Sequence, residues 1–314
     1  MMCIFAHMDF DRMNWNDLRH FLEVARKGRF LGAAKRLGVN HTTVARRISA
    51  LEDALEVKLF EQDENGLHLT DAGETLLPLA QQVENAADLA KERVLLSGHS
   101  LSGNLRIGAP DGFGNAFLAG RINIFMAANP DLTIELLPVP ASHNLLKREV
   151  DLSISLEPTK RKGISVQKIT EYKLFLYTSR EYYNSNGIYI LNINEIIKHP
   201  FADYIPDILY TEQLSFNKYI DSAMVSQFQS STVLAQYEFV ANGGGFGVLP
   251  YFMAHDDPRL VLLFPEKFCF IRSYWLLIPR ELRRLASVRA LESFILSLAK
   301  ENRSRFMPDS GDKR

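Results

Sequence analysis

Two threonines and two arginines between Thr42 and Arg47 have the chemistry to recognise the edges of nucleic-acid bases. An arginine can donate two parallel hydrogen bonds to guanine, and a threonine offers a hydroxyl and a methyl group to neighbouring bases. Helical spacing places Thr42 and Arg46 on the face opposite Val44, with Thr43 and Arg47 beside them. Such a face suits the major groove of double-stranded DNA if a protein core holds the opposite face.

Residues 30–49 are predicted to form the helix-turn-helix that positions this face. Gly38 would end the first helix because a residue without Cβ adopts the left-handed conformation readily. Asn40 stands where an N-cap is needed for the second helix. An ordinary pair of surface helices is the alternative. The buried face of the second helix would be Val44, Ile48, Leu51 and Leu55. The candidate DNA contacts are Arg29, Phe30, His41, Thr42, Thr43, Arg46 and Arg47.

Charge is concentrated around this stretch. Eight basic and three acidic residues lie between Arg26 and Lys58, a local charge of +5 in a chain whose total is −1. A basic island in a nearly neutral protein is typical of a module that binds a polyanion.

The whole chain has 314 residues, 46% hydrophobic and 23% charged, which predicts two or three globular domains. No apolar run is long enough to span a bilayer, so no membrane partner is expected. The first residues make a poor signal peptide, and Cys3 and Cys269 cannot form a disulfide framework, so we expect a cytoplasmic protein. Met8 and Met13 leave the true start open.

Three further elements are predicted around the helix-turn-helix. A first helix begins at Asn14 or Asn16 and ends at Gly28. After the second helix of the motif, Asn65-Gly66 lies between short apolar runs and predicts a hairpin, or wing. The wing would touch DNA beside the second helix of the motif. The alternative is a hairpin with no DNA role, because the acidic side chains around it would repel phosphates.

A long helix is predicted to follow, with Thr70 as its N-cap. Apolar residues then alternate spacings of four and three, the pattern of a two-helix coiled coil. We expect this seam to pair two copies of the chain, and the alternative is a helix packed on its own chain. The candidate dimerisation residues are Leu76, Ala80, Val83, Ala87, Ala90 and Val94.

The order of these motifs resembles the LysR-type transcriptional regulators. The resemblance rests on FLGAAKRLGVNHTTVARRISALEDALEVKLF, on LHLTDAGETLL at the wing, and on GNLRIG after the long helix, and it covers about residues 14–303. Glu56 departs from the usual Gly, so that turn could differ, and Gln62 departs from the usual Arg, which removes an expected phosphate contact. His41-Thr42-Thr43 also departs from the common pattern, so the preferred operator could differ.

The resemblance implies an α/β protein with an N-terminal winged helix-turn-helix, followed by a periplasmic-binding-protein-like effector domain of two α/β subdomains. The expected boundaries are a DNA-binding domain at 13–70, a linker helix at 71–97, a hinge at 98–103 and an effector domain at 104–303. Subdomain I would comprise 104–168 plus 269–303, and subdomain II 169–268. The implied partners are operator DNA, a small-molecule effector, a second copy or a homotetramer, and RNA polymerase.

The C-terminal part also reads as α/β from its own residues. Predicted strands at 105–108, 132–136, 151–155, 166–169, 173–178 and 271–279 alternate with helices at 230–240 and 287–298, which favours a mainly parallel sheet. Ligands bind such sheets beyond the carboxyl ends of strands, and a helix start favours an anionic group. The candidate effector contacts are therefore Pro110, Asp111, Gly112, Phe113, Ser142, Ser230, Thr232 and Phe246. Asp111 would repel an acidic ligand, so the charge of the ligand stays open.

Catalytic motifs are weak or missing. The glycine run at 243–247 ends a helix and lacks the Lys-Ser/Thr of a phosphate loop, so we expect a helix stop and close turn. Ser215-Phe216-Asn217-Lys218 matches Ser-x-x-Lys without the companion motifs of penicillin-recognising enzymes. The histidines have no metal-ligand spacing, and no cofactor, metal or enzymatic activity is expected. A solute-binding protein and an α/β enzyme without a DNA role remain the alternatives.

Overall fold

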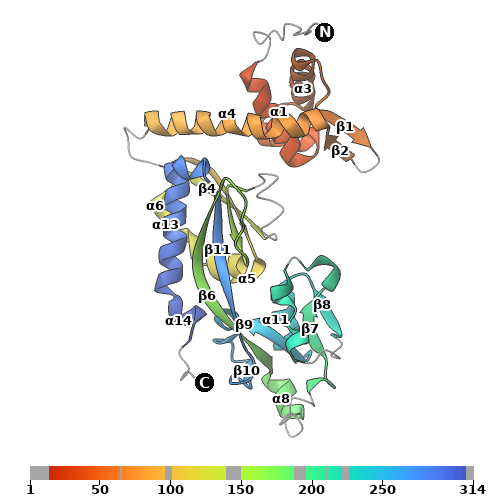
Figure 1. The fold of residues 1–314 in the computed structure, drawn as a ribbon, viewed down its shortest axis with the longest axis vertical. Helices are drawn as coiled ribbons and strands as arrows, with labels where there is room; N and C mark the ends of the chain where they lie inside the picture. The colour runs from red at the N-terminus through yellow and green to blue at the C-terminus, as the bar shows by residue number, and fades with distance from the viewer. Residues whose placement is uncertain are drawn as a thin grey trace. The chain divides into compact units, whose positions relative to one another are not determined.

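The computed structural model describes residues 14–63, 66–95, 101–138, 150–186, 196–209, 211–220 and 226–308. Contacts between residues divide the chain into two compact units, Met1–Val94 and Leu95–Arg314, and each is described by itself. Figure 1 shows the mainly helical first unit and the second unit, which is built around a long twisted sheet.

Three short helices form the centre of the first unit: α1 (Trp15–Lys27), α2 (Phe30–Leu37) and α3 (His41–Leu55). Their ends follow from local sequence. The Asn40 side chain accepts a hydrogen bond from the N–H of Thr42, and Asn14 caps α1 in the same way. Gly28 and Gly38 end α1 and α2 with φ values of 61° and 67°. These caps and the helix-turn-helix are confirmed, and Asn14 is the cap where two asparagines were candidates.

The core of this unit lies between the three helices and the start of α4 (Asp71–Leu95). Val44, Ile48 and Leu51 are buried as predicted, and Leu55 packs at the edge of the same core. The buried residues are Leu18, Phe21, Leu22, Val24, Ala33, Ala34, Val44, Ile48, Leu51, Leu59 and Ala80.

The predicted wing is confirmed as a two-stranded hairpin of β1 (Phe60–Asp63) and β2 (Gly66–Leu69). Its turn at Glu64 and Asn65 lies outside the described residues. The buried Glu52 carboxylate on α3 accepts hydrogen bonds from the N–H groups of Leu59 and Phe60 and pairs with Lys58. This carboxylate therefore fixes the base of the wing to α3.

The long helix α4 is confirmed, and the Thr70 hydroxyl accepts from the N–H of Gly73 at its start. The first three residues of the predicted seam pack on the core of their own chain, as in the alternative given for this helix, and pairing with a second copy stays a prediction. Ala80 is 1% exposed, and Leu76 and Val83 contact the same core. Ala87 and Ala90 are exposed, and the side chain of Val94 lies outside the described residues.

The second unit contains one mixed sheet, with the strand order β4-β3-β5-β11-β6-β9-β7-β8 and with β10 paired to β6. The expectation of a mainly parallel sheet is wrong. No helix lies between Ser155 and Ile164, so the chain returns directly into β6, which pairs antiparallel with β11, β9 and β10. The strands are β3 (Gly103–Ala109), β4 (Leu132–Pro138), β5 (Leu152–Ser155), β6 (Ile164–Ser179), β7 (Phe201–Tyr204), β8 (Phe228–Ser230), β9 (Phe246–Pro250), β10 (Leu260–Leu263) and β11 (Cys269–Pro279).

The strand β6 replaces the two predicted strands at 166–169 and 173–178. It continues through the intervening residues because β11 pairs with it from Ile164 to Phe175, with one irregularity between Tyr274 and Trp275. Figure 1 shows β6 and β11 as the long central strands of the second unit. These two strands therefore connect the two halves of the second unit.

Helices cover this sheet, and α6 (Ile122–Ala128) lies beside α13 (Ala286–Glu301) in Figure 1. After β3, α5 (Asp111–Phe113) passes into a π-helix at Gly114–Leu118 before α6 begins. Asp111 thus starts a helix. The glycine run ends α11 (Val233–Ala241) as expected, with φ values of 82° at Gly243 and 137° at Gly245. The other helices are α8 (Arg180–Asn186), α10 (Asn217–Ile220), α12 (Tyr251–Ala254) and α14 (Arg303–Phe306).

The turn after α3 shows why Glu56 stands out. Glu56 replaces the usual Gly, yet the backbone keeps the left-handed conformation, with φ 56° and ψ 27°, and its N–H bonds to the carbonyl of Glu52. The turn therefore does not differ, and Glu56 carries backbone strain that a residue without Cβ avoids.

We predict that Glu56→Gly stabilises the first unit by about 0.5–1 kcal/mol, because relief of strain outweighs the greater freedom of Gly in the unfolded chain. Scanning calorimetry of the full chain would show the transition of this unit at a higher temperature. Glu56→Ala is the control, since it removes the same side chain but keeps the strain. If the two variants melt alike, the backbone at Glu56 is not strained.

Candidate functional site

The exposed face of α3 carries the predicted base-reading side chains. His41, Thr42 and Arg46 are exposed, and Thr43 is half-buried. Val44 and Ile48 on the opposite face are buried in the core. Among the residues that the structure describes, Arg46 takes part in no hydrogen bond or ion pair. Its guanidinium is therefore available to a partner outside the chain.

Arg47 is placed differently. Its guanidinium donates to the carboxylate of Asp17 on α1 over 3.2 Å, and the Asp17 side chain is only 5% exposed while that of Arg47 is 34% exposed. A carboxylate buried without a partner is costly, so Arg47 has a structural role in joining α1 to α3. Any DNA contact by Arg47 has to compete with this ion pair.

Phe30 is half-buried and packs on the helical core, with its ring 6.4 Å from the ring of Phe60 on the wing. Arg29 precedes it as the N-cap of α2, and Arg29 is exposed and makes no capping hydrogen bond with its side chain. Of this predicted pair, Arg29 presents charge to the solvent and Phe30 mainly supports the wing.

The basic island divides into structural and exposed residues. Lys58 pairs with Glu52, Arg47 with Asp17, and Arg26 with Glu23 and Glu84. The other exposed basic residues surround the helix-turn-helix: Lys27, Arg29, Lys35 and Arg46. The surface available to a polyanion is therefore smaller than the sequence suggests, and it is centred on α2 and α3.

Arg26 is a structural residue that the sequence analysis counted only as part of the local charge. It lies on α1, bonds to Glu23 over 3.1 Å and reaches Glu84 on α4 with two hydrogen bonds. Burial alone would lower the pKa of Arg26, but the two carboxylates raise it above its ordinary value. The spacing of three between Glu23 and Arg26 was the available signal, while the contact with Glu84 is not visible in local sequence. This network fixes α4 to the DNA-binding helices.

In the second unit, Asp111 is the predicted effector contact with the most defined environment. Its Oδ2 accepts a hydrogen bond of 3.0 Å from the N–H of Leu234 in the first turn of α11. Burial raises the pKa of Asp111 above its ordinary value, although backbone N–H groups of Leu234, Asp111, Gly112 and Val233 act in the opposite direction. The carboxylate thus already occupies the helix start that the sequence suggested for an anionic ligand.

The other candidates near this helix start are hydroxyls. Thr232 is the N-cap of α11 and accepts from the N–H of Ala235 over 3.3 Å. The Ser230 hydroxyl accepts from the N–H of Thr232 over 3.1 Å. Both side chains are half-buried. The structure therefore brings Asp111, Ser230 and Thr232 to one end of one helix.

The remaining effector candidates lie deeper. Pro110 and Gly112 are buried, and the ring of Phe113 packs against those of Tyr274 and Phe117 at 4.8 and 5.2 Å. Phe246 is fully buried against Tyr182 and His199. Phe113 and Phe246 therefore belong to the hydrophobic core of this unit, and Ser142 lies outside the described residues. No group of three or more His, Cys, Asp or Glu suited to a metal occurs in the described parts of the chain.

No helix among the described residues is long and apolar enough to cross a membrane. The π-helix at Gly114–Leu118 directly follows α5, which begins at Asp111, and such turns are frequent at functional sites.

Comparison with known proteins gives matches over nearly the whole chain. A family model for a bacterial regulatory helix-turn-helix protein of the lysR family matches residues 15–74, and one for the LysR substrate binding domain matches residues 98–300. The HTH-type transcriptional regulator HdfR of Yersinia pestis (strain Pestoides F) is 28% identical over 258 residues, which are 78% of this chain and 84% of that protein.

Two solved structures have a similar fold. A full-length OxyR variant from Pseudomonas aeruginosa is 19% identical, with a TM-score of 0.65 over 92% of this chain and 95% of its own. Full-length LysG from Corynebacterium glutamicum with bound effector arginine is 18% identical, with a TM-score of 0.61 over 92% of this chain and 99% of its own.

We predict that Arg47→Ala destabilises the first unit by about 1–3 kcal/mol, because the buried Asp17 carboxylate loses its partner. Urea unfolding followed by circular dichroism would measure the loss. Arg46→Ala is the matched control on the same helix, and it should change stability by less than about 0.5 kcal/mol. Equal stabilities for the two variants would mean that the Asp17 pair contributes nothing.

Proposed function

Since the chain belongs to the LysR family and is a transcriptional regulator with a helix-turn-helix and an effector-binding domain, we propose that α3 reads its operator through Thr42 and Arg46. The observation that supports this assignment is the contrast across α3, where the core buries one face and the opposite face presents exposed His41, Thr42 and Arg46. A helix held in this way can enter a major groove without loss of its packing.

Phosphate contacts would surround this reading face. Lys27, Arg29 and Lys35 are exposed on α1 and at both ends of α2. Such contacts position the helix and set the salt dependence, and base contacts set the sequence preference. Gln62 and the acidic residues on the wing would contribute little to phosphate binding.

A second copy of the chain would pair through α4. The exposed apolar stripe on this helix is Leu79, Ala86 and Ala90, spaced by seven and four, and Leu79 is 53% exposed. This stripe shares Ala90 with the predicted seam, whose first residues pack on the core. Two reading heads on paired helices would bind the two halves of a palindrome, and a homotetramer would bind two such sites.

The C-terminal unit would sense a small molecule through two subdomains, 104–168 plus 269–303 and 169–268. The bound arginine of LysG belongs to that protein, but it supports an effector role for the same fold here. Ligand affinity that differs between two arrangements of the subdomains would change the assembly on DNA. The protein would act in the cytoplasm, where the chromosome is, and RNA polymerase is a candidate partner.

Arg46 should determine the sequence preference of the protein for its operator. Fluorescence anisotropy would measure binding to a duplex from the upstream region of the gene and to a scrambled duplex. The difference in binding free energy between the two duplexes should fall by about 1–3 kcal/mol in Arg46→Ala. Lys35→Ala is the matched control, because loss of a phosphate contact should weaken both duplexes equally and lower the salt slope by about one. An unchanged difference for Arg46→Ala would refute the assignment.

The exposed stripe on α4 should be needed for the pairing of two copies. Leu79→Asp should lower the mass observed in sedimentation velocity, because a charge would enter an apolar helix pair while the core of the chain stays intact. Glu74→Gln, about 140° away around the helix, should leave the mass unchanged. A variant Leu79→Asp with the mass of the wild type would exclude this stripe as the interface.

A further inference from the structure

The contact between Asp111 and α11 joins two distant parts of the effector domain. Asp111 follows β3, and Leu234 follows β8 at the opposite end of the sheet order. The hydrogen bond from the Leu234 N–H to Asp111 Oδ2 spans 123 residues of sequence. In the proposed division, Asp111 belongs to subdomain I and Leu234 to subdomain II, so this bond crosses between the two.

The surroundings of this bond are closely packed. A Cβ added at Gly112 would lie 2.9 Å from Cγ1 of Val233 and 3.4 Å from the sulfur of Met253. Val233 starts α11 and Met253 lies on α12, so two elements of subdomain II touch the backbone of subdomain I here. Little space therefore remains beside the backbone of Gly112.

The N–H groups at the start of α11 already have partners. Asp111 accepts from Leu234, the Thr232 hydroxyl accepts from Ala235, and the Ser230 hydroxyl accepts from Thr232. An anion that reached this helix start would have to displace the carboxylate of Asp111, which carries the same charge.

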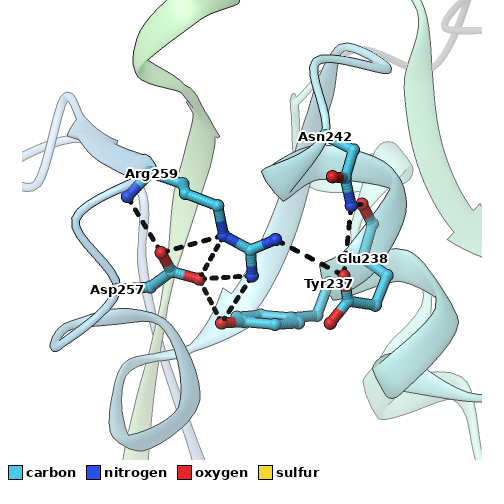
Figure 2. Close-up of polar contacts among 5 residues, drawn as sticks. All are labelled: Tyr237, Glu238, Asn242, Asp257 and Arg259. Atoms are coloured by element: carbon cyan, nitrogen blue, oxygen red, sulfur yellow. Dashed lines mark hydrogen bonds and ion pairs between the residues drawn. The ribbon is translucent and has the colours of Figure 1, made fainter.

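The helix α11 is also tied to its own subdomain. Figure 2 shows the Tyr237 hydroxyl on Asp257 and the Arg259 guanidinium between Asp257 and Glu238. Arg259 donates to Asp257 over 2.7 Å and lies 3.6 Å from Glu238. The ion pair with Arg259 holds the pKa of Asp257 at about 2, so the network stays charged at neutral pH. Since α11 is held to the turn before β10, it has to move together with subdomain II.

We propose that Asp111 is an internal ligand: its carboxylate takes the place of an anionic effector group at the start of α11 and holds the two subdomains together without any effector. The proposal rests on the proposed function only for the identity of the effector domain. It implies that the wild-type protein does not respond to simple carboxylates at this position. Removal of the Asp111 side chain would create a subsite for a monocarboxylate.

The test uses the full-length Asp111→Ala variant and formate, which supplies a carboxylate without the protein backbone. The variant should melt about 3–9 °C below the wild type. Tens of millimolar sodium formate should recover much of this loss, sodium chloride at equal ionic strength should not, and neither salt should shift the wild type in this way. Asp257→Ala is the matched control, because Asp257 contacts the same helix through Tyr237 from the turn before β10. In hydrogen exchange it should leave the amides of 233–236 protected, while Asp111→Ala should expose them until formate is added.

Two results would overturn the proposal: an Asp111→Ala variant that melts like the wild type, or one that formate and chloride affect equally. If the variant does not fold, hydrogen exchange of the wild type decides, because rapid exchange of the Leu234 amide without effector is incompatible with a closed contact. Operator binding is measured separately. A wild-type protein that does not bind operator DNA would refute the proposed function. The formate experiment would still report on the contact between Asp111 and α11.

Discussion

A charge taken out of water needs a compensating partner, and this requirement decides how the helices and strands of both units are joined. In the first unit Asp17 needs Arg47, Glu52 needs the backbone N–H groups at the base of the wing, and Arg26 needs Glu23 and Glu84. Each of these contacts connects elements that hydrophobic burial alone would leave free to slide. Apolar contacts supply most of the stability, while the paired charges fix the register between α1, α3, the wing and α4.

This arrangement separates two kinds of arginine on neighbouring positions of one helix. Arg47 is committed to Asp17, and Arg46 has no partner among the described residues of its own chain. A base contact needs a side chain whose hydrogen bonds are still unmade, on a helix whose position is already fixed. In the proposed function, the structural pair therefore contributes to recognition indirectly, because it removes the freedom of α3 to rotate and present Arg46 at another angle. The pair between Arg26 and Glu84 extends the same rigidity to α4, so the orientation of the reading face relative to that helix is set within one chain.

The features predicted correctly from sequence are those that local chemistry decides. The caps at Asn14, Asn40 and Thr70 and the helix ends at Gly28 and Gly38 depend on residues a few positions apart. The features that were missed depend on distant partners. Leu76, Ala80 and Val83 have a coiled-coil spacing, but the same spacing serves any helix with one buried face, and the core of the chain covers them. The continuity of β6 follows from its pairing with β11, about one hundred residues away, and the occupation of the α11 start by Asp111 is equally non-local. Arg47 and not Arg46 is the structural residue because Asp17 on α1 lies beside it. The spacing of residues along α3 cannot reveal this contact.

The Asp111 contact changes what an effector has to do in this chain. A ligand shifts a conformational equilibrium only by the difference between its affinities for the two states. Where the helix start is empty, an anionic ligand can favour the closed state directly by supplying the missing charge. Here the chain supplies that charge, so an anion at the same position gains little from closure and has to replace a carboxylate held by the backbone. An effector that acts on this domain therefore has to favour an open arrangement that breaks the contact, or bind a closed arrangement through groups other than an anion. In either case the free energy of the Asp111 contact sets the population from which regulation starts.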